Sequence, residues 1–451
     1  MKTLLYIASS ASAGGGGEVY LLSVFRHLDR SRFKPIVLLP AEGSLRAPLE
    51  ALDVEVVVIE SKYGWIKPTR AWYSFLAAYP GRVDQILALI QTRDIDLVHT
   101  NSSTRLEGAL AARLVGVPNI HVAHTRFQPE QPLLQRFPLT REGYAQLLGD
   151  LSAHIVAVSR TVANELVPPL REQHVSVIHN GLDWREFDLA MTGANRLRDE
   201  LGLAADSLLI TAVGRIDAEK GFDTFIAAAG EIAACLPNTH YLLVGGGDDP
   251  VYERRLMEIA SSPVLSGRVH FLGYREDVPR ILAASDVFVL SSHFEGGPYV
   301  LVEAFAARCP AVATRCGGFV EEIVLPGQTG ELVNVGDVAA MAAAIFAVAS
   351  NPERKAMGEA GRRLVQESFD AKTTVGELMA VYQRVLDMPR LAAGSPAVSL
   401  FLHGIKELAD LGAQVVDQEE RLSRLEGETQ FMRMRWIRHI WQGLRAWISH
   451  R

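Results

Sequence analysis

Short apolar runs alternate with helical patterns along most of the chain, and this alternation limits the possible folds more than any other feature. Strands separated by helices are typical of a parallel sheet that is covered on both faces. In the first half, strands are predicted at 3–8, 34–39, 54–59, 97–100, 119–123, 155–157 and 176–178. Helical patterns between them include 18–28, 85–93 and 105–114.

The same alternation begins again at residue 208 and continues to about residue 369. Strands are predicted there at 208–213, 239–244, 269–271 and 287–290. A chain of 451 residues is long enough for two domains with full hydrophobic cores. The sequence therefore predicts an α/β protein with two parallel sheets, joined by a hinge near 180–188.

Composition excludes several classes of protein. Hydrophobic residues make up 48% and charged residues 22%, as in ordinary globular proteins. The net charge of -7 argues against a general nucleic-acid binder. The three cysteines, Cys235, Cys309 and Cys316, fit no disulfide framework or zinc spacing, which favours a reducing compartment. We expect Cys309 and Cys316 to be buried thiols.

The N-terminus resembles a secretory signal but has too short an apolar core. The apolar run at 4–8 falls below the roughly 7–15 residues of such signals, so a buried first strand is the better interpretation. No run approaches the ~18 apolar residues of a spanning helix. A cytoplasmic location is expected.

The richest cluster of candidate site residues lies at 295–303. Glu295 follows a predicted strand and a Gly-Gly-Pro turn separates it from the next helix, which carries Glu303. Ligands bind at the carboxyl ends of strands in open α/β sheets. Glycine-rich loops and helix N-termini suit phosphates, whereas carboxylates suit hydroxyl groups. These requirements together indicate a sugar nucleotide.

Groups suited to phosphates follow the strand at 208–213. The chain turns at Gly214 and then places Arg215 and Lys220 on the loop before the next helix. Arginine supplies a two-pronged donor and lysine a point charge, which together suit a diphosphate. Solvated loop charges are the alternative for both residues.

Seven motifs in order resemble the retaining glycosyltransferases of family 4, which have the GT-B fold. The resemblance covers roughly residues 1 to 388. The motifs are Gly15-Gly16-Gly17-Glu18 and those at 121–124, 178–183, 214–221, 243–247, 271–273 and 295–303. The resemblance implies two Rossmann-like, doubly wound domains facing a cleft. These are an acceptor-side domain at 1–185 and a donor domain at 186–370, followed by a helix at 371–390 that crosses back.

The resemblance also implies a reaction. A sugar would move from a nucleotide-diphosphate donor to a hydroxyl of a glycan or lipid-linked acceptor, with the anomeric configuration kept. The enzyme would need neither a cofactor nor a metal, and cell-envelope polysaccharide or glycolipid assembly is the expected setting. Two alternatives stay open, namely a sugar-nucleotide epimerase of the same fold and an inactive nucleotide-sugar-binding scaffold.

Residue roles follow motif by motif from the same resemblance. His124 would reach the donor sugar and the reaction centre, Arg215 and Lys220 would neutralise the leaving diphosphate, and Glu295 would lie near the sugar. Arg126 is a candidate acceptor contact. The expected donor-binding residues are Gly15, Gly16, Gly214, Arg215, Lys220, Gly273, Arg275, Gly297, Pro298, Tyr299 and Glu303.

Two acidic pairs were considered as metal ligands. Asp94-Ile95-Asp96 has the spacing of a metal motif in another glycosyltransferase class, but it directly precedes a strand. Asp248-Asp249 is better placed to cap a helix that begins near Pro250. No metal site is predicted.

Residues 391–451 lie outside the family pattern and predict a helical extension. Apolar residues recur there at alternating three- and four-residue spacings, which favours a coiled coil and a homodimer through 401–436. A single helix packed on the enzyme is the alternative. The seam consists of Leu408, Leu411, Val415, Gln418, Leu422, Leu425, Thr429, Met432 and Trp436.

Residues 431–451 form a basic amphipathic pattern with three tryptophans and no acidic residue. Such a helix suits an anionic membrane surface, which would make the protein peripheral on the inner face of the cytoplasmic membrane. Association with a protein partner is the alternative. An aromatic segment in the first half is either an acceptor-side surface or core, and it contains Tyr63, Trp65, Trp72, Tyr73 and Phe75.

Overall fold

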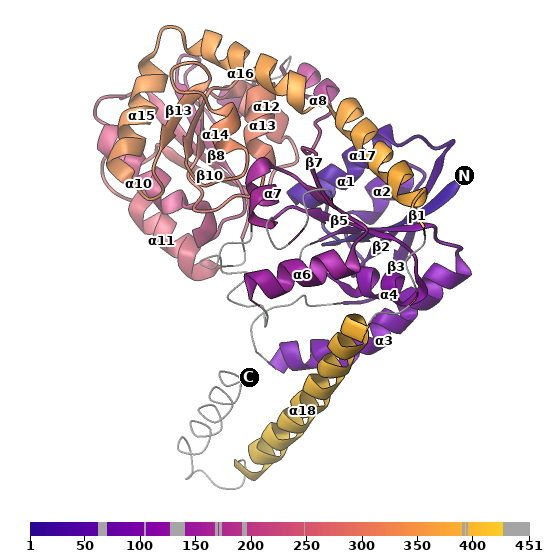
Figure 1. The fold of residues 1–451 in the computed structure, drawn as a ribbon. Coiled ribbons are helices and arrows are strands. Elements are labelled where there is room, and N and C mark those ends of the chain that lie inside the picture. Colours follow the sequence, from indigo (N-terminus) through magenta and orange to yellow (C-terminus); the bar gives the residue numbers. More distant parts are fainter. Residues whose placement is uncertain are drawn as a thin grey trace.

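The computed structural model describes the chain as two parallel β-sheets with helices on both faces of each (Figure 1). The described residues are 1–61, 70–102, 105–126, 140–166, 170, 174–191, 196–247, 249–389, 393 and 396–426.

The first sheet has seven strands in the order β3-β2-β1-β4-β5-β6-β7. Its neighbouring strands are all parallel. The strands are β1 Lys2–Ala8, β2 Phe33–Leu39, β3 Glu55–Val58, β4 Leu97–Asn101, β5 Asn119–Ala123, β6 His154–Ala157 and β7 Val175–Val177. The helices between them are α1 Gly16–His27, α2 Arg46–Ala51, α3 Arg70–Thr92, α4 Glu107–Val115, α6 Arg141–Leu151 and α7 Arg160–Leu166.

The second sheet has six parallel strands in the order β10-β9-β8-β11-β12-β13. The strands are β8 Leu208–Val213, β9 Thr239–Val244, β10 Val269–Gly273, β11 Val287–Leu290, β12 Ala311–Thr314 and β13 Gly330–Val333. The helices are α8 Trp184–Ala190, α9 Arg196–Glu200, the 3-10 turn η3 Ala218–Lys220, α10 Phe222–Ile232, α11 Pro250–Ala260, α12 Val278–Ala284, α13 Tyr299–Ala306, α14 Val320–Ile323, α15 Val338–Ser350 and α16 Arg354–Ser368.

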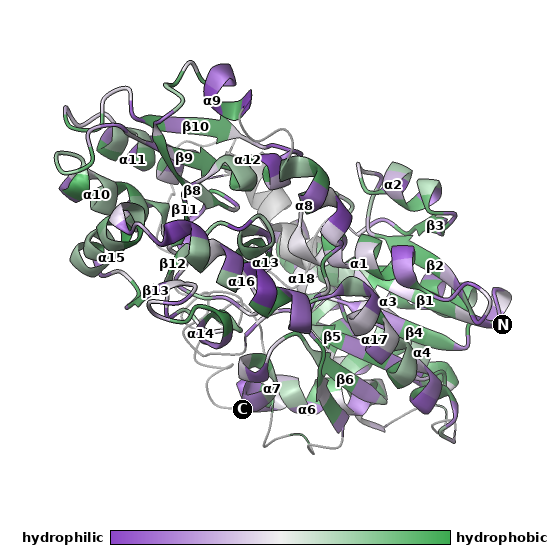
Figure 2. Cartoon of the chain, turned by 90° about the horizontal axis from the view of Figure 1, so that it is seen from above, coloured by the Kyte–Doolittle hydropathy of each residue, from purple (hydrophilic) through white to green (hydrophobic). Residues whose placement is uncertain are grey.

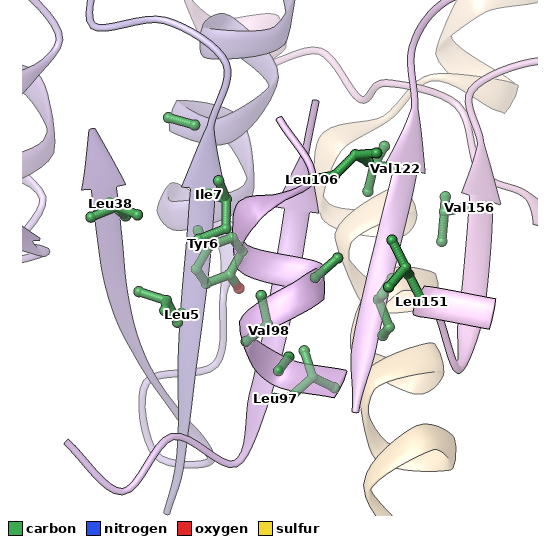
Figure 3. Packing of buried hydrophobic residues seen from close by; sticks show 14 of the residues in the cluster. Leu5, Tyr6, Ile7, Leu38, Leu97, Val98, Leu106, Val122, Leu151 and Val156 are labelled. Carbon is green, nitrogen blue, oxygen red and sulfur yellow. The ribbon is translucent and has the colours of Figure 1, made fainter. Parts of the chain in front are cut away.

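The strands are buried on both faces, which explains why they read as continuous apolar runs rather than as alternating patterns. In β1, Leu4, Leu5 and Tyr6 have no exposed surface, and Val98 of the neighbouring β4 has none either. Figure 3 shows these side chains packed between the sheet and its helices. The strands of both sheets are mostly hydrophobic, and the helices around them carry more polar residues (Figure 2).

The chain passes twice between the two halves, and the two crossings lie side by side. The N–H group of Leu182 donates to the carbonyl of Phe369 at 2.7 Å, and the N–H group of Ala371 donates back to Leu182 at 3.2 Å. After this bridge, α17 Ala371–Leu386 returns to the first half. There Leu378 and Tyr382 are buried in the core of the first sheet, so the predicted crossing helix is confirmed.

The strand predictions agree with the structure to within two residues at either end. The strands at 119–123, 208–213, 239–244 and 287–290 match it fully. Asp249 caps α11 by accepting hydrogen bonds from the N–H groups of Val251 and Tyr252, as predicted. Cys309 and Cys316 are both 1% exposed, which confirms the expected buried thiols.

The C-terminal extension begins with α18 Pro396–Glu426, which packs against α3 beneath the first sheet (Figure 1). Val398, Ile405 and Ala409 form its buried face. The seam residues Leu408 and Leu411 lie elsewhere on the helix and are 39% and 51% exposed. The helix thus packs on α3, while Leu408 and Leu411 of its predicted coiled-coil seam remain exposed.

Two other sequence predictions fall partly or wholly outside the described residues. Residues 431–451 lie outside them, as do Tyr63 and Trp65, and the side chains of Trp72 and Tyr73 are not described. Phe75 is 3% exposed and belongs to the core, so for this residue the core alternative is confirmed. Among the residues that the structure describes, no helix is both long and apolar enough to cross a membrane.

Candidate active site

Each sheet reverses its strand order at one point, and the candidate site residues gather at these two points. The reversal lies between β1 and β4 in the first sheet and between β8 and β11 in the second. Loops at the carboxyl ends of strands part at such points and leave a crevice for ligands. The loop after β1 carries Gly15 and Gly16, and the loops after β8 and β11 carry Lys220 and Glu295.

Lys220 and Glu295 meet although 75 residues separate them in the chain. The Lys220 Nζ donates to Glu295 Oε1 at 2.7 Å, and Ser292 Oγ donates to the same oxygen at 2.7 Å. The N–H group of Glu295 donates to the carbonyl of Cys316, which fixes the loop from the other side. The side chains of Lys220 and Glu295 are only 23% and 10% exposed. The pair is therefore a fixed, mostly desolvated element of the crevice.

Electrostatics around this pair favour a charged lysine. Burial alone would lower the pKa of Lys220, but the attraction and hydrogen bond of Glu295 outweigh it, so the pKa lies above its ordinary value. Burial raises the pKa of the neighbouring Glu219 carboxyl, against the attraction of Lys220. Burial also raises the pKa of the Cys316 thiol to about 12, so this thiol stays protonated beside the pair.

The glycine loop of the first half faces the second half directly. Gly15 caps the N-terminus of α1 with extended backbone, and no side chain caps that end of the helix. A Cβ atom at Gly16 would lie 3.8 Å from the Cβ of Tyr299, at the start of α13. A Cβ atom at Gly14 would crowd the ring of Tyr274, which follows β10. Glycine at these positions lets the two halves approach each other closely.

His124 lies at the carboxyl end of β5 and is half-buried. Its Nε2 is 2.7 Å from Asn101 Oδ1, and its ring meets the ring of Tyr20 edge-on at 5.2 Å between centroids. Burial lowers the pKa of His124 to about 4, so the imidazole is neutral near pH 7. A Cβ atom at Gly296 would overlap the carbonyl oxygen of His124. His124 is thus brought to the Glu295 loop, and its predicted contact with the donor sugar stays a prediction.

The other predicted cations make ion pairs near the site. Arg215 Nε contacts Asp217 on its own loop, and the Arg215 side chain is 66% exposed. Arg275 binds Glu200 at 2.8 Å and Asp277 at 2.8 Å. These bonds raise the pKa of Arg275 and lower the pKa of Asp277. A donor contact by Arg275 therefore stays a prediction. It requires the Arg275 guanidinium to bind the donor while it also binds Glu200 and Asp277.

Arg126 joins the two halves of the molecule. Its guanidinium binds the Glu165 carboxylate at 2.8 Å and donates to the carbonyl of Cys316 at 3.0 Å. Ser159 donates to the carbonyl of Gly296, and Thr161 donates to the carbonyl of Gly318, in the same region. These bonds join loops of the two halves beside the candidate site. The acceptor contact proposed for Arg126 stays a prediction.

Close packing of loops explains several glycines of the donor side. A Cβ atom at Gly245, which has φ of 140°, would overlap the carbonyl oxygen of Gly214. Gly273 has φ of 65°, a left-handed conformation that favours glycine. A Cβ atom at Gly297 would crowd Val158 of the first half. Pro298 caps α13, and Glu303 lies half-buried one turn into that helix.

The acidic pair at 94–96 has a structural role at the amino-terminal ends of β1 and β4, away from the candidate site. Asp96 binds Lys2 Nζ at 2.8 Å and accepts from the N–H group of Thr3 at 2.9 Å, just before β4. Within the described part of the chain, no group of three or more His, Cys, Asp or Glu side chains could hold a metal ion. The metal-free reaction stays a prediction.

Sequence reasoning missed the polar residues that hold the predicted ones in place. Asn101 contacts His124, Ser292 contacts Glu295, and Glu165 contacts Arg126. Asn101 ends β4 and Ser292 closely follows β11, so a search for polar residues at the carboxyl edges of strands would have found both. Glu165 lies on α7, and only the tertiary structure reveals its partner.

Comparison with protein families settles what kind of molecule carries this crevice. A family model described as Glycosyltransferase Family 4 matches residues 14–185, and a second, Glycosyl transferases group 1, matches residues 194–364. The chain is a family 4 glycosyltransferase. The two matches divide the enzyme near the crossing at Leu182, so each sheet corresponds to one family domain.

Individual relatives agree with this assignment. The glycosyltransferase is 27% identical over 303 residues to an Escherichia coli UDP-Gal:alpha-D-GlcNAc-diphosphoundecaprenol alpha-1,3-galactosyltransferase, covering 65% of this chain and 76% of the relative. It is 28% identical over 397 residues to a D-inositol 3-phosphate glycosyltransferase of Mycobacterium bovis, covering 82% and 79%. The crystal structure of Anabaena HepE in complex with UDP-glucose has the same fold, with a TM-score of 0.72, 22% identity, and coverage of 85% of this chain and all of that one.

Proposed function

We propose that this glycosyltransferase transfers a sugar from a nucleoside-diphosphate sugar to a hydroxyl group, with retention of the anomeric configuration. The observation that carries the proposal is the mostly buried Lys220–Glu295 pair, which joins the loops after β8 and β11. The Anabaena neighbour was solved with UDP-glucose, which supports a nucleotide sugar as donor. No cofactor is part of the proposal.

The charges of Lys220, Arg215 and Glu295 give these residues different roles in the proposed reaction. Departure of the nucleotide leaves negative charge on the diphosphate, which Lys220 and Arg215 neutralise. Glu295 holds Lys220 in place until the donor arrives and then lies near the sugar. No side chain caps the N-terminus of α1 or of α13, and a helix N-terminus of this kind suits phosphate oxygens. The leaving phosphate oxygen takes the proton of the attacking hydroxyl.

Thermal stabilisation by nucleotides tests the donor site. UDP-, GDP- and ADP-sugars are each added to wild type and to Lys220→Ala. A ligand at about 100 times its Kd adds about 2.7 kcal/mol to the free energy of unfolding, which is readily visible as a rise in Tm. A rise with one nucleotide that Lys220→Ala abolishes would support the proposal. No rise with any nucleotide at millimolar concentration would contradict it.

The product's stereochemistry tests the reaction itself. NMR of a product formed from the accepted donor gives the anomeric configuration, and an inverted anomer would exclude retention. Interconversion of two free sugar nucleotides without an acceptor would instead identify an epimerase. Binding of the nucleotide sugar with neither sugar transfer nor donor hydrolysis would identify a scaffold.

We propose a glycan or lipid-linked acceptor, in cell-envelope polysaccharide or glycolipid assembly. The name of the Escherichia coli relative describes a lipid-diphosphate acceptor, which supports the idea. The basic segment 431–451 would dock to an anionic membrane surface on the cytoplasmic side. Sedimentation with vesicles of anionic and of neutral lipid tests this. Equal binding to both, or to neither, would contradict it.

We also propose a homodimer through the open seam of α18. Leu408 and Leu411 are exposed on this helix while its other face packs on α3, so the seam remains accessible to a second copy. Analytical ultracentrifugation of wild type and of the double variant Leu408→Lys, Leu411→Lys tests this. A monomeric wild type at micromolar concentration would contradict it.

A further inference from the structure

Asn101 connects two parts of the site that come from different elements. It is the last residue of β4 and is fully buried. Its Nδ2 donates to the carbonyl of Gly17 in the first turn of α1, at 3.0 Å. Its Oδ1 lies 2.7 Å from Nε2 of His124, at the end of β5. One carboxamide therefore joins the glycine loop to the candidate catalytic histidine.

The chemistry of these partners fixes where the protons lie. The carbonyl oxygen of Gly17 can only accept, so the NH₂ group of Asn101 must face it. The amide oxygen of Asn101 then faces His124, and it too can only accept. Nε2 of His124 must therefore carry a proton. Because a neutral imidazole has a single N–H group, Nδ1 is left with a free lone pair.

The surroundings keep this imidazole neutral. The half-buried ring meets Tyr20 from α1 edge-on and contacts Asn101 from β4, and His99 and His121 lie close enough to interact with it electrostatically. Burial lowers the pKa of His124 to about 4 and the pKa values of His99 and His121 to about 3. None of the three histidines is charged near pH 7, so Nδ1 of His124 keeps its lone pair.

We infer that Asn101 is a positioning residue, which holds His124 in the Nε2–H tautomer so that Nδ1 accepts a hydrogen bond from a hydroxyl of the bound sugar. The inference rests on the proposed function for its ligand, but the tautomer itself does not depend on it. Asn101 also ties the orientation of the ring to the start of α1.

The tautomer can be measured directly in the unmodified protein. Two-dimensional ¹H–¹⁵N spectra of histidine-labelled wild type distinguish the two neutral tautomers, and His124→Gln assigns the signal. We expect Nε2–H at pH 7. Finding Nδ1–H in wild type would overturn the inference even if the enzyme is an active transferase. If no transferase activity is found, the spectrum still decides the tautomer, so the two failures are distinguishable.

Two variants test the consequence for catalysis. Asn101→Leu removes the acceptor for Nε2–H, so we expect a mixture of tautomers and about a tenfold lower kcat with a smaller change in KM for the donor. Asn101→Asp places a carboxylate against Nε2–H and raises the pKa of His124. Because protonated His124 cannot accept through Nδ1, we expect the acid limb of the kcat profile to move to higher pH.

Asn119→Asp is the matched control. Asn119 is also a buried amide, at the opposite end of β5, where it binds Thr100 and Ser152. This variant should leave the tautomer of His124 and the acid limb unchanged. An acid limb that stays in place in folded Asn101→Asp, or moves equally in Asn119→Asp, would overturn the inference. If Asn101→Leu does not fold, Asn101→Asp and the wild-type spectrum still decide it.

Discussion

At the scale of single residues, cations of the candidate site form ion pairs with acidic side chains. Lys220 pairs with Glu295, Arg126 pairs with Glu165, and Arg215 pairs with Asp217. A buried charge without a partner is costly, which explains the pairing of Lys220 and Arg126, whereas Arg215 is 66% exposed. The pairing also explains why acidic residues lie beside the proposed phosphate site.

The first prediction concerns Lys220. Lys220→Met removes the charge opposite the leaving diphosphate, and we expect kcat to fall by about 10² to 10³, as for the loss of one preorganised electrostatic group. Steady-state kinetics with the accepted donor measures this. Lys2→Met is the control, because Lys2 makes a 2.8 Å ion pair with Asp96 at the far edge of the first sheet. A Lys220→Met enzyme as active as the control would contradict the assignment.

The second prediction concerns pH and stability. His121 is fully buried, neither of its ring nitrogens has a hydrogen-bond partner among the described residues, and burial lowers its pKa to about 3. The unfolded chain binds a proton near pH 6.5, and the folded state does so only near pH 3. His121 therefore contributes stability above pH 6.5 that is lost as the pH falls, by about 1.4 kcal/mol per unit within that window.

Urea unfolding between pH 7 and pH 4.5 measures this effect. His121→Leu should retain more of its free energy of unfolding at low pH than wild type does. His403→Leu alters an exposed histidine on α18 and should follow wild type. Parallel pH profiles for wild type and His121→Leu would show that the buried imidazole is not the cause.

The candidate site was predicted where residues lie within a motif and missed where they come from elsewhere. His124 directly follows β5, and Lys220 and Glu295 lie in the connections after β8 and β11, so their position at the carboxyl ends of strands follows from local pattern. Asn101 and Ser292 were missed although each also lies at or near a strand end, because single polar residues there are common. Glu165 could not have been found, since only the packing of α7 brings it to Arg126.

At the scale of elements, α18 has one buried face and one exposed face. The face containing Ile405 completes the core of the first half over α3, and the face containing Leu408 and Leu411 remains exposed. A heptad pattern in the sequence detects the second face but says nothing of the first. The sequence therefore predicted the helix and offered packing and pairing as alternatives, whereas the structure leaves room for both.

The third prediction separates these two faces. Ile405→Ala empties a buried position and should lower the free energy of unfolding by about 2–5 kcal/mol. Leu411→Ala removes an exposed side chain and should change it by less than about 0.5 kcal/mol. Urea unfolding monitored by circular dichroism compares them. Equal losses in the two variants would mean that α18 does not pack as described.

The fourth prediction concerns the loop between β11 and α13. A Cβ atom at Gly296 would overlap the carbonyl of His124, so Gly296→Ala must push the two halves apart. We expect at least a tenfold loss of kcat. Gly376→Ala is the control, because nothing lies within 4 Å of a Cβ there and alanine favours the helix α17. Wild-type kinetics in Gly296→Ala would show that this close approach is not needed.

The strands were predicted better than the helices because buried parallel strands leave a strong local signal. Apolar runs such as 208–213 are bounded by polar or glycine residues at both ends. The helix α3 extends back to Arg70, fifteen residues before the predicted start at 85, and contains Pro80. This helix is stabilised by tertiary contacts with α4 and α18, which no local pattern reveals.

At the scale of the whole molecule, the donor-side groups lie in the second half and α18 packs on the first. We predict that a chain ending at residue 395 keeps the rise in Tm with its donor nucleotide, because Arg215, Lys220 and Glu295 are untouched. Its first half should unfold at lower temperature, since α3 loses its cover. Differential scanning calorimetry measures both effects. Loss of the nucleotide response would show that the extension supports the donor site.

The paired crossings at Leu182 and Phe369 have a consequence for how such enzymes change over evolution. The chain leaves the first half near Leu182 and returns to it near Phe369, and backbone hydrogen bonds join these two points. The residues between them therefore form an insertion into the first half. Residues 183–369 can therefore be exchanged as one block without moving either neighbour of the junction. The proposed donor site would change in this way, while the first half and its C-terminal extension stay intact.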